Sequence, residues 1–379
     1  MELATASPQP AAKRQRIIGL ELLRCVSTAL IVFLHLVNTG GFANAVGVNL
    51  KPESLITVFI TVFACCTVSI YGMISGYVMI SSTFKLRRWF AMWFQVVATA
   101  LAICVFFTIL RPGYVSTEIW ISTFLPISQK TFWYYSAYAG LYIFVPLLNR
   151  ALNAMSNKAM IALSMGILVL FSCLVFVDRN YLNKDPFDMS NGYSMLWMAF
   201  MYVLGATMRK TQVFRPLRTG VIVALCVGCT LLCQAVLIAS TYPGLGFLHH
   251  LKVTSMVNPL LMVPSILSVE LFTRIRLGKT ATKIVNFFAP LTFGVYLVHA
   301  HTLTYTELAN RTIALAKLPS VLSILALIGA VLTLCVVCSL LEWVRQRVFR
   351  LCRVEKLCVF LETKTVALFE RIYSHIDKA

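Results

Sequence analysis

The sequence has few charged residues and no long polar segment. Of its 379 residues, 12% are charged and 59% are hydrophobic, and the mean hydropathy is +0.81. The longest polar connections, residues 111–130 and 179–192, have only the length of loops. A separate soluble catalytic domain is therefore not expected, and any chemistry must take place in the apolar segments and their loops.

Acidic residues are especially scarce, since 14 Asp and Glu stand against 33 Lys and Arg and the net charge is +19. Such an excess can indicate nucleic-acid binding, but here the basic residues gather at the ends of apolar runs, as in membrane proteins. We therefore expect no nucleic-acid partner. The first apolar run is not followed by a cleavage site, so we expect it to be retained. The sequence also has no clear internal repeat, which disfavours a transporter built from duplicated halves.

The apolar runs predict an all-α, polytopic integral membrane protein, because a membrane-spanning backbone must satisfy its own hydrogen bonds. We expect about ten transmembrane helices within a domain of residues 17–343, preceded by a polar segment of residues 1–16. Residues 344–379 are basic and amphipathic, which predicts a helix lying on anionic lipid. The ten runs are residues 17–38, 55–80, 89–110, 131–149, 159–178, 193–208, 219–240, 253–273, 284–305 and 320–343.

The distribution of basic residues predicts the orientation. Of the 33 Lys and Arg, 24 fall on the side of the N-terminus and eight on the other, while Arg24 lies within the first run. The positive-inside rule then places both termini in the cytoplasm. The chain is therefore expected to be a multi-pass membrane protein with its basic loops on the cytoplasmic side.

Twelve cysteines are present, but most lie within apolar runs, where they are typical of small buried hydrophobic residues. The pairs Cys226-x-x-Cys229 and Cys335-x-x-Cys338 have a redox spacing without the strand-to-helix context that the motif needs. We expect no metal site and no bound cofactor.

The first apolar run carries ionisable residues, which are costly in a membrane and usually functional. Arg24 and His35 are eleven residues apart, so they return to within about 20° of the same helical face. Glu21, Arg24, Thr28 and His35 therefore form one polar stripe, about 16 Å long between Arg24 and His35 at the rise of an α-helix. Such a stripe could hold an extended, charged ligand that enters from one side.

Four segments, in order along the chain, resemble one family, the acyltransferase 3 membrane acyltransferases of bacterial envelopes. They are Gly19 to Arg24 with His35; Met73-Ile-Ser75-Gly76-Tyr77; Phe132-Trp133-Tyr134-Tyr135 with Tyr138 and the run from Leu141 to Asn149; and Phe293-Gly294-Val-Tyr296-Leu-Val-His299. One departure is Lys85-x-x-Arg88, where many members of the family have Arg-x-x-Arg.

The resemblance implies an O-acyltransferase that moves an acyl group, most often acetyl, from acyl-coenzyme A to a hydroxyl of a lipid-linked glycan or surface polysaccharide. His35 would be a general base, and Arg24 and Glu21, toward the other end of the stripe, would be the other catalytic residues. The predicted binding residues are Lys85, Arg87, Arg88, Ser75 and Tyr77 for acyl-coenzyme A and Trp133, Tyr134, Tyr138, Asp185 and His299 for the acceptor. Membrane lipid, acyl-coenzyme A and glycan are the expected partners, and association into a homo-oligomer stays open.

Structural interpretations compete with several of these assignments. His35 could simply bridge helices, and Lys85, Arg87 and Arg88 could only set the topology. The aromatic residues around Trp133 could form an interfacial belt, and loop acids such as Asp185 are commonly solvated. Pairs such as Glu270 with Arg274 and Glu342 with Arg345 are expected to be structural ion pairs.

Two other classes of function fit an apolar chain with intramembrane charges. One is a transporter or flippase for polysaccharide intermediates, without acyl transfer. The other is a non-catalytic membrane scaffold, which the cost of the intramembrane charges disfavours. A His three turns from an Arg, beside a basic cluster, favours the enzyme, because a glycan channel needs no coenzyme site.

Overall fold

The computed structural model describes residues 16–39 and 41–376, and in these ranges the chain forms helices and loops without a strand. The predicted all-α class is confirmed. Residues 1–15 of the predicted polar N-terminal segment lie outside the described residues.

Seven helical segments in the described part of the chain are long and apolar enough to cross a membrane. The protein is therefore a multi-pass membrane protein. These segments are Ile18–Asn38, Pro52–Met79, Leu86–Leu110, Asn157–Leu182, Thr219–Ala239, Lys279–Ala300 and Val321–Leu351. The other three predicted spans coincide with helices α7 (Trp133–Ala154), α10 (Met195–Thr211) and α12 (Pro259–Thr273). The total of ten spans stays a prediction.

Several spans consist of more than one helix. The second is α3 (Pro52–Ala64) followed by α4 (Thr67–Met79), the fifth contains α8 (Asn157–Leu168) and α9 (Val175–Val177), and the ninth is α13 (Lys279–Phe288) followed by α14 (Thr292–Ala300). The remaining helices are α1 (Ile18–Thr39), α2 (Phe42–Val46), α5 (Leu86–Leu110), α6 (Thr117–Phe124), α11 (Thr219–Ala239), α15 (Thr302–Thr312), α16 (Ser320–Leu351) and α17 (Val354–Ile376). Single turns of 3-10 or π helix occupy residues 169–174, 178–182, 190–192, 246–250, 289–291 and 315–317.

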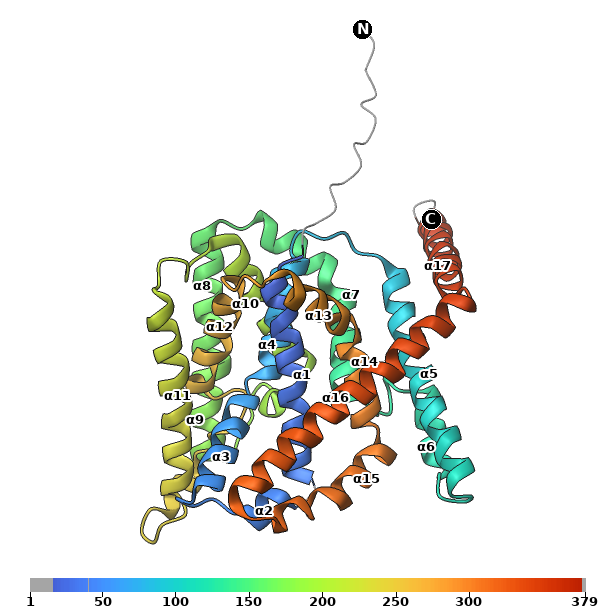
Figure 1. Ribbon diagram of the computed structural model, residues 1–379. Coiled ribbons are helices and arrows are strands. Elements are labelled where there is room, and N and C mark those ends of the chain that lie inside the picture. The colour runs from blue at the N-terminus through green and yellow to red at the C-terminus, as the bar shows by residue number, and fades with distance from the viewer. Residues whose placement is uncertain (1–15, 40, 377–379) are drawn as a thin grey trace.

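Helix α1 lies in the middle of the bundle (Figure 1), where it contacts α3, α4, α12, α14 and α16. Leu20, Leu23, Val32 and Phe33 are buried against these neighbours. The polar stripe of α1 is thus enclosed by protein, which removes the cost of exposing it to lipid tails.

Helices α4 and α10 cross with their backbones in direct contact. A Cβ atom on Gly76 would overlap the carbonyl oxygen of Tyr202, and one on Gly205 would overlap that of Met73. Small residues at such crossings let membrane helices approach closely. The crossing fixes the position of α4, which carries Tyr71 and Ser75 toward the centre of the bundle.

The C-terminal region is helical and continuous with the membrane helices. Helix α16 runs through residue 343 to Leu351, and after the turn at Cys352 and Arg353 helix α17 packs against α5. The predicted position of this tail on the lipid surface stays a prediction. Helices α2, α6 and α15 lie at the opposite end of the bundle from the first turn of α1 (Figure 1).

The charge-based orientation predicts that Lys51, at the start of α3, faces outward and that Arg215, between α10 and α11, faces the cytoplasm. The test uses variants without native cysteines, in cells whose outer barrier is permeabilised and whose cytoplasmic membrane is intact. Lys51→Cys should react with an impermeant thiol reagent in these cells, and Arg215→Cys should react only after lysis. Labelling of residue 215 in intact cells would overturn the orientation.

Candidate active site

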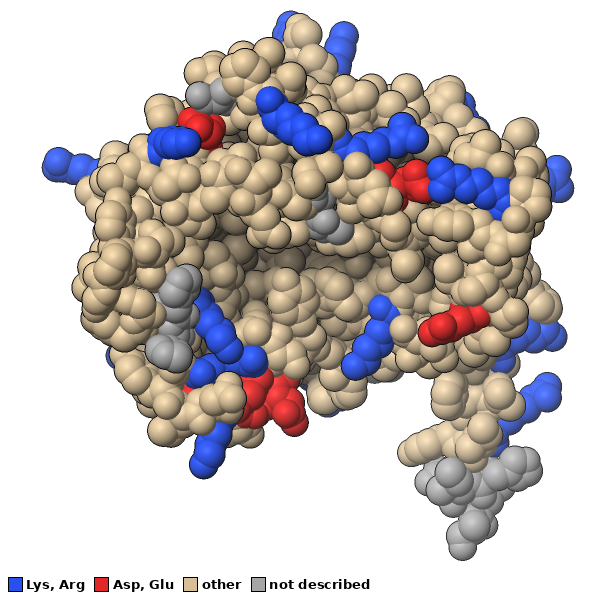
Figure 2. Space-filling view, turned by 90° about the horizontal axis from the view of Figure 1, so that it is seen from below, with Lys and Arg blue, Asp and Glu red and all other residues tan. Residues whose placement is uncertain are grey.

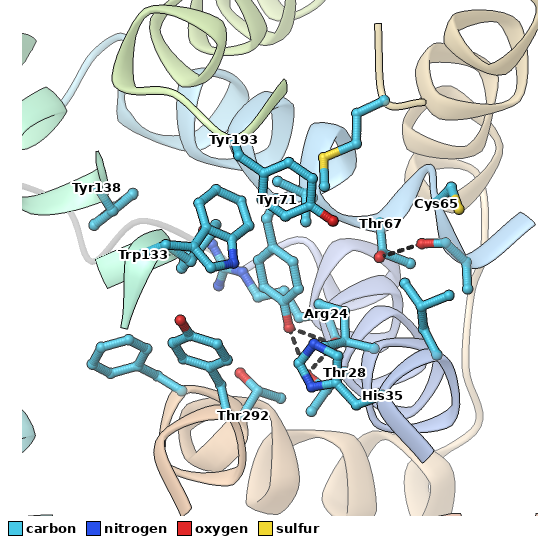
Figure 3. A pocket seen from close by; sticks show the side chains of 18 of the residues that line it. Arg24, Thr28, His35, Cys65, Thr67, Tyr71, Trp133, Tyr138, Tyr193 and Thr292 are labelled. Atoms are coloured by element: carbon cyan, nitrogen blue, oxygen red, sulfur yellow. Dashed lines mark hydrogen bonds between the residues drawn. The ribbon is translucent and has the colours of Figure 1, made fainter. Parts of the chain in front are cut away.

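A cavity of about 550 Å³ lies at the centre of the bundle, between α1, α4, α7 and α14. Its volume is typical of small-molecule sites. Figure 3 shows side chains from these helices pointing into it. Arg24, Thr28 and His35 all line this cavity, so the prediction that they share one face of α1 is confirmed.

Arg24 is held in place by two sets of hydrogen bonds. Its Nη1 donates to both carboxylate oxygens of Glu21 at 3.0 Å, so the two side chains form an ion pair one turn apart on α1. The backbone carbonyl of Arg24 accepts from the hydroxyls of Thr28 and Tyr71, each at 2.9 Å. The hydroxyls of Thr28 and Tyr71 also contact each other at 2.5 Å. The bonds to Glu21 hold the guanidinium at one end of the cavity, and some of its donors are not used by Glu21.

His35 is paired with His299 from α14. The Nδ1 atom of His35 lies 3.0 Å from Nε2 of His299, and Nδ1 of His299 lies 2.6 Å from the carbonyl oxygen of Val295. His299 is buried, and both imidazoles line the cavity. The sequence predicts His299 as an acceptor-binding residue, whereas in the structure it contacts His35, the proposed general base.

This chain of contacts determines where the protons of the two neutral rings lie. A carbonyl oxygen only accepts, so Nδ1 of His299 must carry the proton, and its Nε2 is then an acceptor. Nδ1 of His35 must therefore donate to it, which leaves Nε2 of His35 without a proton. A neutral imidazole in this tautomer can accept a proton from a hydroxyl at Nε2.

Aromatic rings cover much of the remaining cavity wall. Tyr134 stacks on Tyr138 with centroids 6.1 Å apart, and its ring also contacts Tyr71 and Tyr296 edge-on. Trp133 packs against Tyr193 at 4.6 Å. All six rings line the cavity, so Trp133, Tyr134 and Tyr138 are cavity residues and not only a membrane belt.

The cavity opens at one end of the bundle. Figure 2 shows a deep hollow in the middle of the face seen from below, with Lys and Arg side chains around it. Asn191, Lys252 and Ser255, from loops at this end, line the cavity together with Tyr193. The charge map predicts that this face is the outer one.

The three basic residues at the start of the third span lie apart from this cavity. Lys85, Arg87 and Arg88 line a second cavity of about 540 Å³ between the start of α5 and the junction of α16 and α17. The two cavities are therefore separate compartments that adjoin along α5, where Met92 lines the first and Gln95 the second.

A family model for an acyltransferase domain, that of acyltransferase 3, matches residues 17–340 of the chain. The chain belongs to the acyltransferase 3 family. It has no match among curated proteins or among solved structures. The resemblance of its four motifs is thus confirmed, and the protein is a membrane acyltransferase.

The family motifs meet in this fold at the cavity. The first supplies Arg24 and His35, the second Ser75, and the last His299, all of which are cavity residues. Gly294 of the last motif is required by packing, since a Cβ there would overlap Glu342. Glu342 bonds to Arg345, and Glu270 bonds to Arg274, so both expected ion pairs are confirmed.

Two residues that were predicted to bind a substrate have structural contacts elsewhere. Tyr77 is buried beneath the guanidinium of Arg209, 5.3 Å from the ring centroid. Asp185 organises its own loop: it pairs with Arg179 and accepts from the backbone N–H groups of Met189 and Ser190. These contacts use both carboxylate oxygens of Asp185, and neither residue lines the two cavities described above. Their predicted roles in binding remain untested.

His301, two residues after His299, caps helix α15. Its Nδ1 accepts from the backbone N–H of Leu303 at 3.3 Å, and its side chain is buried. His301 lies between α14 and α15 in extended backbone, and its side chain does not line the cavity that contains His299. Among the described residues, no group of three His, Cys, Asp or Glu side chains could hold a metal ion.

Sequence reasoning missed Tyr71, Tyr193 and the pairing of His35 with His299. Tyr71 lies one turn before Ser75 on α4, so the helical period could have placed it on the same face. Tyr193 carries no such signal, because it lies in a loop that follows a turn of 3-10 helix. The histidine pair joins residues 264 positions apart, and no local pattern predicts it.

Proposed function

We propose that the protein is an O-acetyltransferase of the bacterial inner membrane. It moves the acetyl group from cytosolic acetyl-coenzyme A to a hydroxyl of a lipid-linked glycan or cell-surface polysaccharide. The observation that supports this most is the hydrogen-bonded pair of His35 and His299 in an aromatic-lined cavity. Membership in an acyltransferase family supports the reaction type.

The chemistry proposed for the cavity is a direct transfer between two bound substrates. Nε2 of His35 accepts the proton of the glycan hydroxyl as its oxygen attacks the thioester carbonyl carbon. A carbon–oxygen bond forms, the carbon–sulfur bond breaks, and the proton held by His35 passes to the departing thiolate. Arg24 contributes its free guanidinium donors to the donor side of the cavity.

The aromatic wall and the open end of the cavity form the proposed acceptor side. Tyrosine and tryptophan rings offer flat apolar surfaces with polar edges, which suit the alternating C–H and O–H groups of a sugar. Trp133 and Tyr193 stand near the loop residues Asn191 and Ser255, whose amide and hydroxyl can bond to sugar hydroxyls. A glycan would therefore enter from the end opposite Arg24.

The direct test uses purified protein, radiolabelled acetyl-coenzyme A and a crude glycan fraction from the envelope. Label transferred to the glycan, and stable to extraction, supports the enzyme. Movement of glycan across reconstituted vesicles without transfer of label would support the flippase instead. The histidine pair favours transfer, because a transport pathway has no need for an oriented base.

We expect Arg24 to affect binding of the acyl donor and Trp133 to affect binding of the acceptor. Removing a charge-assisted hydrogen bond costs about 1.5–3 kcal/mol, so Arg24→Ala should weaken acetyl-coenzyme A binding by about tenfold or more. Trp133→Ala should leave that affinity intact and reduce O-acetylation of the glycan. Calorimetry on the purified variants measures the first effect, and glycan analysis in cells measures the second. Equal loss of donor affinity in both variants would show that the two-sided arrangement is wrong.

A further inference from the structure

The second cavity is built partly by the C-terminal tail. The cationic residues along it are Lys85, Arg87 and Arg88 from the start of α5 and Arg345 and Arg350 from the end of α16, and Glu355 of α17 is the acid among its lining residues. The family model ends at residue 340. Two of the five cations, and the helix that closes the cavity, therefore lie outside the matched domain.

Three of these cations have no carboxylate partner among the described residues, although Arg88 also bonds to the hydroxyl of Tyr142. Arg345 is bonded to the buried carboxylate of Glu342 at 2.6 Å, and Arg87 is within 4.0 Å of Glu362. Within the described part of the chain, no ion pair includes Lys85, Arg88 or Arg350. A cavity with an excess of cationic side chains attracts anions, and phosphate is an anion that both Arg and Lys commonly bind in proteins.

Specific contacts hold the tail in this position. A carboxylate oxygen of Glu362 on α17 accepts from the backbone N–H of Arg87 at 3.1 Å, in the first turn of α5. That N–H has no partner within its own helix, so the contact caps α5. The guanidinium of Arg345 also covers the ring of Phe349 at 4.3 Å, and Cys358 is buried. The tail is thus docked on α5 and closes one side of the cavity.

The cavity also adjoins the one that contains His35. Gln346 lines the basic cavity and donates to the carbonyl of Pro290, a residue of the central cavity, at 3.5 Å. Gln95, also in the basic cavity, bonds to Glu342 at 3.1 Å. One layer of residues therefore separates the basic cavity from the site of the histidine pair.

We propose that the C-terminal tail completes a phosphate-binding pocket and that Arg350, with Lys85 and Arg88, binds the nucleotide phosphates of the acyl donor. The inference rests on the proposed function and extends it, since it makes the tail part of the donor site. In such a donor a long flexible arm joins the phosphorylated nucleotide to the thioester. The phosphates could therefore bind in the basic cavity while the thioester reaches the adjoining central cavity. The arm would enter the central cavity at Met92 and Pro290, which line that cavity where the two cavities adjoin.

The test is calorimetry of coenzyme A and of pantetheine, which lacks the nucleotide, with the purified full chain in neutral-lipid nanodiscs. Arg350→Glu should weaken coenzyme A binding by about tenfold or more, because it replaces an attraction with a repulsion, and should leave pantetheine binding unchanged. Arg350→Lys should retain most of the affinity. The control is Arg371→Glu on the exposed part of α17, which should bind as the wild type does.

The outcomes separate this inference from the function on which it rests. If the wild type binds coenzyme A and Arg350→Glu binds it equally well, the tail pocket is wrong and the proposed function stands. If the wild type binds no coenzyme A, the proposed donor is wrong and the pocket falls with it. An anionic lipid headgroup is the other source of phosphate. Unchanged coenzyme A binding, together with loss of thermal stabilisation by phosphatidylglycerol in Arg350→Glu, would assign the pocket to lipid.

Discussion

Replacing His35 with alanine is expected to abolish acyl transfer while the protein still inserts and accumulates. General base catalysis contributes about 10²- to 10⁴-fold to rate, and the alanine leaves no other imidazole nitrogen in the position of Nε2. His35 is only partly buried, so the loss of its ring should not unfold the protein. The measurement is O-acetylation of the cell-surface glycan, normalised to the amount of protein in the membrane.

Two other histidines provide matched variants. His301→Asn should retain most of the transfer, because asparagine can still cap α15 and this residue lies outside the cavity. His299→Gln should give an intermediate rate, since His35 remains but its tautomer is no longer fixed by the bond to His299. Glycan O-acetylation at the wild-type level in His35→Ala would refute the catalytic role.

Replacing Gly76 with leucine should prevent the protein from folding. Any side chain there overlaps the carbonyl oxygen of Tyr202 and comes within 3.0 Å of the amide nitrogen of Ala206, so α4 and α10 must move apart. Overpacking of a well-packed interior costs about 1–3 kcal/mol and occasionally more, and here both neighbours are rigid backbone. The expected result is loss of the monodisperse peak in size-exclusion chromatography of detergent-solubilised protein.

Gly228 on α11 supplies the control for this prediction. A Cβ at Gly228 would have no atom within 4 Å, although this glycine also lies in a membrane-spanning helix. Gly228→Leu should therefore give a normal peak and near-normal thermal stability. A stable, monodisperse Gly76→Leu protein would mean that the helices do not cross with their backbones in contact.

The sequence predicted the parts of the site that depend on one helix. Arg24, Thr28 and His35 share a face because eleven residues complete three turns, and the structure places all three in one cavity. The helical period says nothing about which distant helix faces that stripe. The partner of His35 therefore became known only from the packing of α14 against α1.

Residues outside the helices were harder to place. Asp185 was grouped with the acceptor site because it is an acid in a loop on the predicted outer side, but Arg179 and two backbone N–H groups use its oxygens. Tyr193, in the same loop region, lines the cavity and gave no signal. Loop conformation depends on such local bonds, and a pattern of hydrophobicity does not encode them.

The layer between the two cavities also affects whether protons and ions can leak across the membrane. A water-filled passage through both would let protons and ions flow down their gradients and dissipate the membrane potential. Met92 and Pro290 line one cavity and Gln95 and Gln346 the other, and the two share no lining residue. A membrane acyltransferase built in this way keeps its two cavities apart and does not act as a leak, so the electrochemical gradient across the membrane is preserved.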